Sequence, residues 1–304
     1  MRIGVMLDGS APLQSVVSQF SQAEEAGFAS AWLPNIFAND ALTVLALAGA
    51  HTSRIELGTS VVPTFPRHPT ALAQQALTVQ AATNGRLALG IGLSHKPVIE
   101  QMMGLDFTRP VRHMREYLAA LTALLSGQPA HFDGDVYRIH LQLTVPGALP
   151  PPLLVAALGP QMLQVAGHMA TGTITWMGGP IYLERDVVPT INAAAQEAGQ
   201  PAPRIVAGFP IAVTGQVEAA KAAARRVFAA YATLPSYRAI LDREGAADAA
   251  DVAIIGDEQA IAVQVERLAA AGVTDLICSF YPIEEDADVQ VRSHATLAQL
   301  ALLQ

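Results

Sequence analysis

The sequence predicts an α/β fold, a single (β/α)8 (TIM) barrel over residues 1–304 with an insertion after the fourth strand. Eight short apolar runs alternate with longer runs of helical periodicity along the chain. The first four short runs are apolar on both faces, as in parallel strands that crossover helices cover. At 304 residues and 51% hydrophobic content, the chain is long enough for one such barrel domain. An open doubly wound sheet is less favoured, since it usually has fewer strands and a nucleotide fingerprint.

Each short run is bounded by residues that end strands or begin helices. Gly27 is placed to end the first helix, Asp40 to cap the second, and Gly272 to end the last helix before the final strand. The expected strands are residues 3–7, 29–33, 55–62, 87–91, 153–157, 173–177, 205–213 and 275–280. The expected helices are residues 12–26, 40–50, 70–82, 110–125, 161–169, a stretch ending at Glu197, 218–233, 236–247, 257–271 and 288–302.

The regular alternation lapses between the fourth and fifth strands. We interpret residues 93–150 as the insertion, with a helix at 110–125 and a short hairpin at 136–145. Residues 146–152 contain four prolines and are expected to form an extended loop.

Composition argues against several classes of partner. The formal net charge is −8, and no cluster of Lys and Arg is present, so we expect no nucleic-acid partner. The most apolar stretch, residues 41–50, is far shorter than the ~20 residues of a membrane span, so we expect no membrane partner. Cys278 is the single cysteine, which excludes a disulfide within the chain and fits a cytoplasmic location.

In a barrel, function gathers at the carboxyl ends of the strands. These ends are Asp8, residues 34–35, 60–63, 92–95, 158–160, 176–179, 213–214 and 279–280. They are rich in Gly, Ser, Thr and amide side chains and poor in acids. This composition favours a bound cofactor with backbone donors for an anion over a hydrolytic centre.

Other kinds of site lack their signatures. No His-x-His pair is present, so we expect no metal, and the Gly-x-Ser-x-Gly of many hydrolases is absent. Gly90 and Gly92 form only a fragment of a dinucleotide fingerprint, and Cys278 is expected to be a core residue. Five histidines are expected to be structural: His51, His113, His131, His168 and His294.

Two loops carry chemical information. Residues 92–96 follow the fourth strand with a hydroxyl, an imidazole and a cation from Ser94, His95 and Lys96. Residues 159–162 follow the fifth strand and begin a helix, where free N–H groups favour phosphate. The alternatives are a capped loop at Ser94 and a tight Gly-Pro turn at Gly159.

Several motifs together resemble one family. They are LGTSVVPT at residues 57–64, PRHP at 66–69, QQALT at 74–78, NGRLALGIG at 84–92, AEEAGF at 23–28 and AWL at 31–33. In order and spacing, from residue 1 to about 280, the chain resembles the luciferase-like oxidoreductases. Residues 94–95, 150–157, 158–162 and 175–177 resemble the branch assigned to the deazaflavin coenzyme F420; the alternative cofactor is FMN.

The resemblance implies a cis peptide at Ser60–Val61 that presses against the cofactor ring, with the phosphate end at the fourth and fifth loops. The implied cofactor-binding residues are Asn35, Thr59, Ser60, Val61, Ser94, His95, Ala157, Gly159, Pro160, Gln161, Met162, Trp176 and Met177.

The implied activity is hydride transfer between F420 and a small organic substrate. Relatives that oxidise sugars or alcohols carry Asp-His after the second strand and an acid after the fourth; the matching positions here are Asn35-Ile36 and Leu93. This departure favours a reductase of a polarised double bond. His95 is then the candidate catalytic acid, or alternatively a donor to the cofactor phosphate.

Two further alternatives are an FMN-dependent monooxygenase of the same superfamily and a non-catalytic flavin or deazaflavin carrier. The resemblance also implies a homodimer that pairs through residues 39–84. Small residues there would let helices approach closely: Ala46, Ala48, Ala71 and Ala73.

Overall fold

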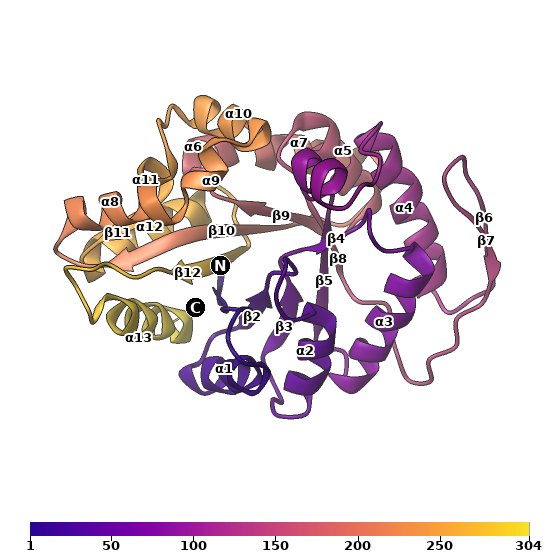
Figure 1. The fold of residues 1–304 in the computed structure, drawn as a ribbon, viewed down its shortest axis with the longest axis horizontal. Helices are drawn as coiled ribbons and strands as arrows, with labels where there is room; N and C mark the ends of the chain where they lie inside the picture. Colours follow the sequence, from indigo (N-terminus) through magenta and orange to yellow (C-terminus); the bar gives the residue numbers. More distant parts are fainter. Residues whose placement is uncertain (304) are drawn as a thin grey trace.

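Parallel strands close into a barrel in the computed structural model, which describes residues 1–303 (Figure 1). Around the barrel the pairing order is β1-β2-β3-β5-β8-β9-β10-β12, and β12 pairs again with β1. The strands are β1 (Arg2–Met6), β2 (Ser30–Leu33), β3 (Glu56–Thr59), β4 (Val62–Pro63), β5 (Leu87–Gly92), β8 (Leu153–Ala156), β9 (Gly172–Trp176), β10 (Arg204–Val213) and β12 (Asp275–Phe280). The predicted fold class is confirmed.

The register brings all carboxyl ends of the strands to one mouth. Arg2 pairs with Asp275, and Ser30 pairs with both Gly4 and Glu56, so neighbouring strands begin at similar heights. β10 continues beyond its neighbours and pairs there with an extra strand, β11 (Ile254–Gly256). At three residues, β11 is too short to be recognised from periodicity, and it was not among the predicted strands.

The third barrel strand is interrupted at its carboxyl end. It was expected to run unbroken over residues 55–62, but β3 and β4 are separate segments. The cis peptide expected at Ser60–Val61 is present between them. The Thr59 hydroxyl donates to Gly90 O at 2.8 Å and accepts from Gly90 N at 2.9 Å, so a side chain replaces ladder bonds at the break.

Helices cover the outside of the barrel (Figure 1). Gly27 ends α1 in a left-handed conformation at φ 92°, and the Asp40 carboxylate caps α2 by accepting from Thr43 N, as expected. The helices are α1 (Leu13–Ala26), α2 (Ala41–Gly49), α3 (Pro69–Ala82), η1 (Val98–Met102), α4 (Pro110–Leu125), α5 (Pro160–Met169), α6 (Pro180–Tyr182), η2 (Leu183–Val187), α7 (Val188–Glu197), α8 (Val217–Val227), α9 (Ala229–Ala232), α10 (Pro235–Glu244), α11 (Ala249–Val252), α12 (Glu258–Ala270) and α13 (Val289–Leu302).

The insertion is smaller than residues 93–150. α4 packs between α3 and α5 and is therefore the fourth helix of the outer ring. The added pieces are the segment before α4, which contains η1, and an antiparallel hairpin after it. That hairpin, β6 (Ala130–Asp133) with β7 (Arg138–Leu141), lies outside α3 and α4 (Figure 1).

Two expected elements had wrong bounds. The hairpin was expected at 136–145, which misses β6, because AHFD carries too few apolar residues to read as a strand. The helix expected over 218–233 breaks at Phe228, which separates α8 from α9. Phe228 is buried, and the backbone leaves helical geometry there.

Side chains fill the barrel interior from the amino ends of the strands to its middle. Trp32, Ala88, Leu154 and Ile174 lie in this inner cluster, with Val206 and Ile277. At the amino ends of the strands, the Arg204 guanidinium contacts Glu56 Oε1 at 2.9 Å and Asp275 Oδ1 at 2.6 Å. These ion pairs and the inner cluster fill the lower part of the barrel, whereas the space at the carboxyl ends stays open.

No helix within residues 1–303 is both long and apolar enough to cross a membrane.

Candidate active site

A cavity of about 980 Å³ opens at the carboxyl ends of the barrel strands. This volume is at the upper end for small-molecule sites, which are typically about 300–1,000 Å³. Eight of the residues predicted to bind a cofactor line it: Asn35, Ser60, Val61, Ser94, His95, Gly159, Met162 and Trp176.

The other five predicted residues do not line the cavity. Thr59, Ala157 and Met177 are buried. The Thr59 hydroxyl is hydrogen-bonded to the backbone of Gly90 and is not available to a ligand. Pro160 and Gln161 are exposed on the first turn of α5. Their contact with a cofactor stays a prediction.

The loop after β5 places His95 at the mouth. Ser94 adopts the left-handed region at φ 61°, which is uncommon outside glycine and often found at ligand sites. His95 is half-buried, and this burial lowers the pKa of its imidazole. The ring has no hydrogen-bond partner in the part of the chain that the structure describes, so its nitrogens remain free for a ligand.

The turn after β8 presents uncapped N–H groups. Gly159 is the N-cap of α5, no side chain caps this helix, and Pro160 occupies its first turn. A Cβ built on Gly159 would meet no atom within 4 Å. The turn therefore faces open space, as an anion site at a helix start requires.

One side of the cavity is aromatic, and we call Trp176, Phe228, Tyr231 and Tyr237 the aromatic wall. Ring centroids are 5.9 Å apart for Trp176 and Phe228, 6.1 Å for Trp176 and Tyr231, and 4.9 Å for Tyr231 and Tyr237. Tyr237 also approaches His95 at 5.8 Å. The wall therefore reaches from the sixth and seventh strands to the loop after the fourth.

Of this wall, only Trp176 was predicted from the sequence as a site residue. The other three lie in the helices predicted at 218–233 and 236–247, to which the sequence assigned no role in the site. A usable signal was present in Tyr231 and Tyr237, which flank Pro235 between two helices.

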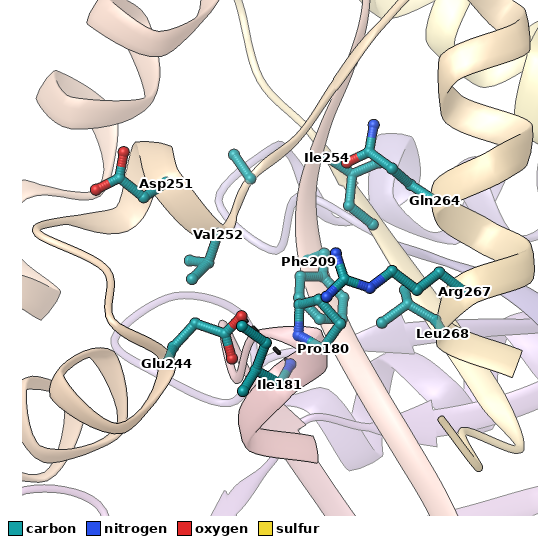
Figure 2. A pocket seen from close by; sticks show the side chains of 11 residues that line it. Pro180, Ile181, Phe209, Glu244, Asp251, Val252, Ile254, Gln264, Arg267 and Leu268 are labelled. Carbon is teal, nitrogen blue, oxygen red and sulfur yellow. Dashed lines mark hydrogen bonds between the residues drawn. The ribbon is translucent and has the colours of Figure 1, made fainter. Parts of the chain in front are cut away.

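α10, which carries Tyr237, is fixed by hydrogen bonds to the loop after β9. Glu244 accepts from Ile181 N at 3.3 Å (Figure 2). It also accepts from Tyr182 N at 2.7 Å. The Tyr182 hydroxyl donates in turn to Leu158 O at 2.6 Å. One chain of contacts thus positions both the aromatic wall and the turn before Gly159.

Behind this anchor lies a second, smaller cavity of about 150 Å³ (Figure 2). Its charged lining residues are Glu244, Asp251 and Arg267. Glu244 is already engaged with α6, and Asp251 accepts from Ala247 N at 2.8 Å. The volume is below that of ordinary ligand sites, so we interpret this cavity as a packing space.

A side lobe of the main cavity lies between α1 and α13. It is lined by Gln19, Gln22, Gln290 and His294. His294 was expected to be structural, and it does pack edge-on against Phe28 with ring centroids 5.0 Å apart, but it also faces the cavity.

Charge in the cavity is sparse. Among the lining residues that the structure describes, none is Lys or Arg, and Asp8 is the single carboxylate. Hydrogen bonds from the hydroxyl and N–H of Ser10 hold the pKa of Asp8 below its usual value. Within residues 1–303, no group of three His, Cys, Asp or Glu side chains is placed to hold a metal ion.

Comparison with known proteins places the chain in a family. Residues 1–275 match the model of the luciferase-like monooxygenases. The chain belongs to the luciferase-like monooxygenase family. The resemblance inferred from the motifs at the third and fourth strands is thereby confirmed.

Three proteins similar to this chain are named for coenzyme F420 or for a methanopterin reductase activity. A putative coenzyme F420-dependent oxidoreductase of Mycobacterium tuberculosis is 31% identical over 235 residues, which cover 71% of this chain and 66% of that protein. The 5,10-methylenetetrahydromethanopterin reductase of Methanolobus tindarius is 26% identical over 258 residues, which cover 84% and 78%. The coenzyme F420-dependent tetrahydromethanopterin reductase of Methanopyrus kandleri shares the fold, with a TM-score of 0.83, 23% identity and coverage of 98% and 97%.

Proposed function

We propose that this luciferase-like oxidoreductase transfers hydride between coenzyme F420 and a small organic substrate, as a reductase of a polarised double bond. The observation that carries the proposal is the large cavity at the carboxyl ends, bounded by the Ser60–Val61 peptide and by the uncapped turn at Gly159. The similarity to a putative F420-dependent oxidoreductase and to a reductase supports the choice of cofactor and reaction.

The residues present fit a deazaflavin. The floor of the cavity is apolar, because Met6, Val61 and Ala156 pack on the inner barrel cluster. A Cβ on Gly92 would lie 2.6 Å from Val61 Cγ2, so glycine at this position lets Val61 occupy the floor. A flat ring system can lie on such a surface, with its phosphate at the start of α5, where backbone N–H groups take the place of a cation.

When bound, the reduced cofactor supplies a hydride to the electrophilic carbon of the substrate. The protein must orient that carbon and provide a proton. The positions where relatives carry acids hold Asn35, Ile36 and Leu93. His95 is then the titratable residue of the fourth loop that lines the cavity. Burial lowers the pKa of His95, and an anion bound at the adjacent strand end would favour the protonated imidazole again.

Titration with cofactors tests the proposal. The protein is titrated with F420 and with FMN, and reduced F420 is then oxidised in the presence of a panel of enones, aldehydes and imines. We expect F420 to bind and at least one acceptor to accelerate loss of the reduced form, with the oxidised band returning near ~420 nm.

The other outcomes separate the alternatives. Tight binding of FMN with oxygen-dependent turnover would replace the proposal by a flavin monooxygenase; the family is named for monooxygenase activity. Binding of F420 without turnover of any acceptor would favour a carrier.

We also propose a homodimer that pairs through α2 and α3. Neither helix contains a charged residue, and Leu47 is exposed on α2. Ala48 and Ala73 are fully buried within the chain, so close approach of a partner helix would involve Ala46 and Ala71 instead.

A further inference from the structure

The aromatic wall stands across the barrel mouth from the expected place of the cofactor ring. Ser60 and Val61 follow the third barrel strand, whereas Phe228 and Tyr231 follow the seventh. In an eight-stranded barrel these strands are opposite each other. A ring bound on Ser60–Val61 therefore leaves the aromatic wall, which lines the same cavity, free for a second molecule.

The charges around the mouth select against an anionic second molecule. Asp8, which follows the first strand, is ionised at neutral pH and is the single carboxylate among the lining residues within 1–303. Gly159 follows the fifth strand, which is opposite the first strand in the barrel. A cofactor anion at the start of α5 would therefore be remote from Asp8. A negative substrate in between would meet a fixed negative charge with no Lys or Arg to pair with.

The wall also offers a hydrogen-bond donor. Tyr237 is buried and lines the cavity, and its hydroxyl bonds to no other residue that the structure describes. Burial raises the pKa of this phenol, so it keeps its proton at any physiological pH. The Trp176 Nε1 atom, by contrast, is enclosed beside the Tyr231 hydroxyl and completes no hydrogen bond, so it belongs to the packing of the wall.

From this arrangement we infer the substrate class: an uncharged, flat, ring-bearing carbonyl or imine compound. Its ring packs on Phe228 and Tyr231, and its oxygen or nitrogen accepts a hydrogen bond from the Tyr237 hydroxyl. This inference rests on the proposed reductase function. Reduction adds one hydride, from the reduced deazaflavin, and one proton, from His95 or water, so that the double bond becomes single.

Binding of three matched probes tests the inference without requiring turnover. They are 4-phenylbut-3-en-2-one, its para-carboxylate, and pent-3-en-2-one, in which methyl replaces the phenyl ring. Affinities are measured by calorimetry on the full chain, both alone and saturated with oxidised F420. We expect the uncharged phenyl enone to bind at least about tenfold more tightly than either of the other two, since ring burial and absence of charge each favour it.

Two pairs of variants locate the contact. Phe228→Leu and Tyr237→Phe should each weaken binding of the phenyl enone about threefold to tenfold, through lost ring contact and a lost hydrogen bond respectively. The matched controls, Phe132→Leu and Tyr137→Phe, lie on the hairpin outside the cavity and should leave this affinity unchanged.

Equal affinity for the three probes, tighter binding of the carboxylate, or no binding of the phenyl enone at ~1 mM would overturn the inference. Variants that weaken F420 binding but not the phenyl enone would also overturn it, because the wall would then belong to the cofactor. Failure of the proposed function has a different signature: the binding preference persists, but reduced F420 is not consumed.

Discussion

Protonation of His113 should destabilise the protein in mild acid. The His113 ring stacks on Phe65, with centroids 4.0 Å apart and planes 3° apart, and its Nε2 lies 3.0 Å from the Thr64 hydroxyl. Thr64 N in turn donates to Gly92 O at 2.9 Å, which joins this cluster to the mouth of the barrel. Burial lowers the pKa of His113 to about 4, and the nearby Glu116 carboxylate offsets this only in part.

The sign of the effect follows from proton uptake. The unfolded chain takes up a proton near pH 6.5, whereas the folded protein takes it up only near pH 4. The contribution of neutral His113 to the free energy of unfolding is therefore fully present above pH 6.5 and is lost as the pH decreases toward 4. At about 1.4 kcal/mol per pKa unit, the full loss is about 3 kcal/mol, of which about 2.5 kcal/mol falls between pH 7 and pH 4.5.

Urea unfolding of the wild type and of His113→Phe at both pH values measures this loss. Phenylalanine keeps the stack on Phe65 but cannot take up a proton. We expect the variant to lose about 1–3 kcal/mol at pH 7, because the Thr64 hydroxyl loses its partner, and to have a shallower pH dependence. Other groups with lowered pKa values, such as His294, titrate in both proteins and cancel in the difference. If the free energy of unfolding falls equally in both proteins, within about 0.5 kcal/mol, protonation of His113 is not the cause of the loss.

Three further predictions concern the site and the assembly. Gly159→Asp places a carboxylate where the anion is expected and should raise the Kd for F420 more than about tenfold, whereas the neutral control Gly159→Asn should change it less than about threefold; equal effects would remove the anion site from this turn. His95→Gln should abolish any rise of kcat/KM below pH 6.5 if His95 is the acid, or weaken F420 binding if it holds the phosphate; a change below about threefold in both would exclude either role. Leu47→Glu should yield monomers by light scattering while Leu13→Glu on α1 leaves the mass unchanged, and a wild-type monomer at micromolar concentration would contradict the pairing.

The fold class could be predicted from the sequence because the apolar runs and helix caps that indicate it are local features. Apolar runs such as residues 87–91 are buried in full, and the caps at Gly27 and Asp40 end or begin helices where expected. The motif at residues 57–64 also implied the cis peptide at Ser60–Val61, which is present. These features depend on residues near each other in the chain, so periodicity and capping rules suffice for them.

The errors arose where distant segments decide the structure. Phe228 interrupts a helical pattern on entering the cavity wall, and β6 becomes a strand only by pairing with β7. The local pattern of apolar residues predicts neither contact. In both cases, burial or pairing with a remote segment outweighs the intrinsic structural preference of the residues.

The amino-acid sequence was sufficient to predict the barrel, its mouth and the two loops that carry His95 and Gly159, since each of these follows directly from one strand and the helix after it. The place of Tyr231 and Tyr237 beside the cavity depends on contacts between distant segments. The Glu244 contacts with α6 hold α10 over the mouth and bring Tyr237 to His95, and Tyr231 of α9 packs on Tyr237. The tertiary structure also decided that Thr59, Ala157 and Met177 are buried away from the cavity although they lie in expected site motifs. Alternation along a strand assigns a side chain to one of two faces, but the packing of the neighbouring helices determines which of those faces borders the cavity.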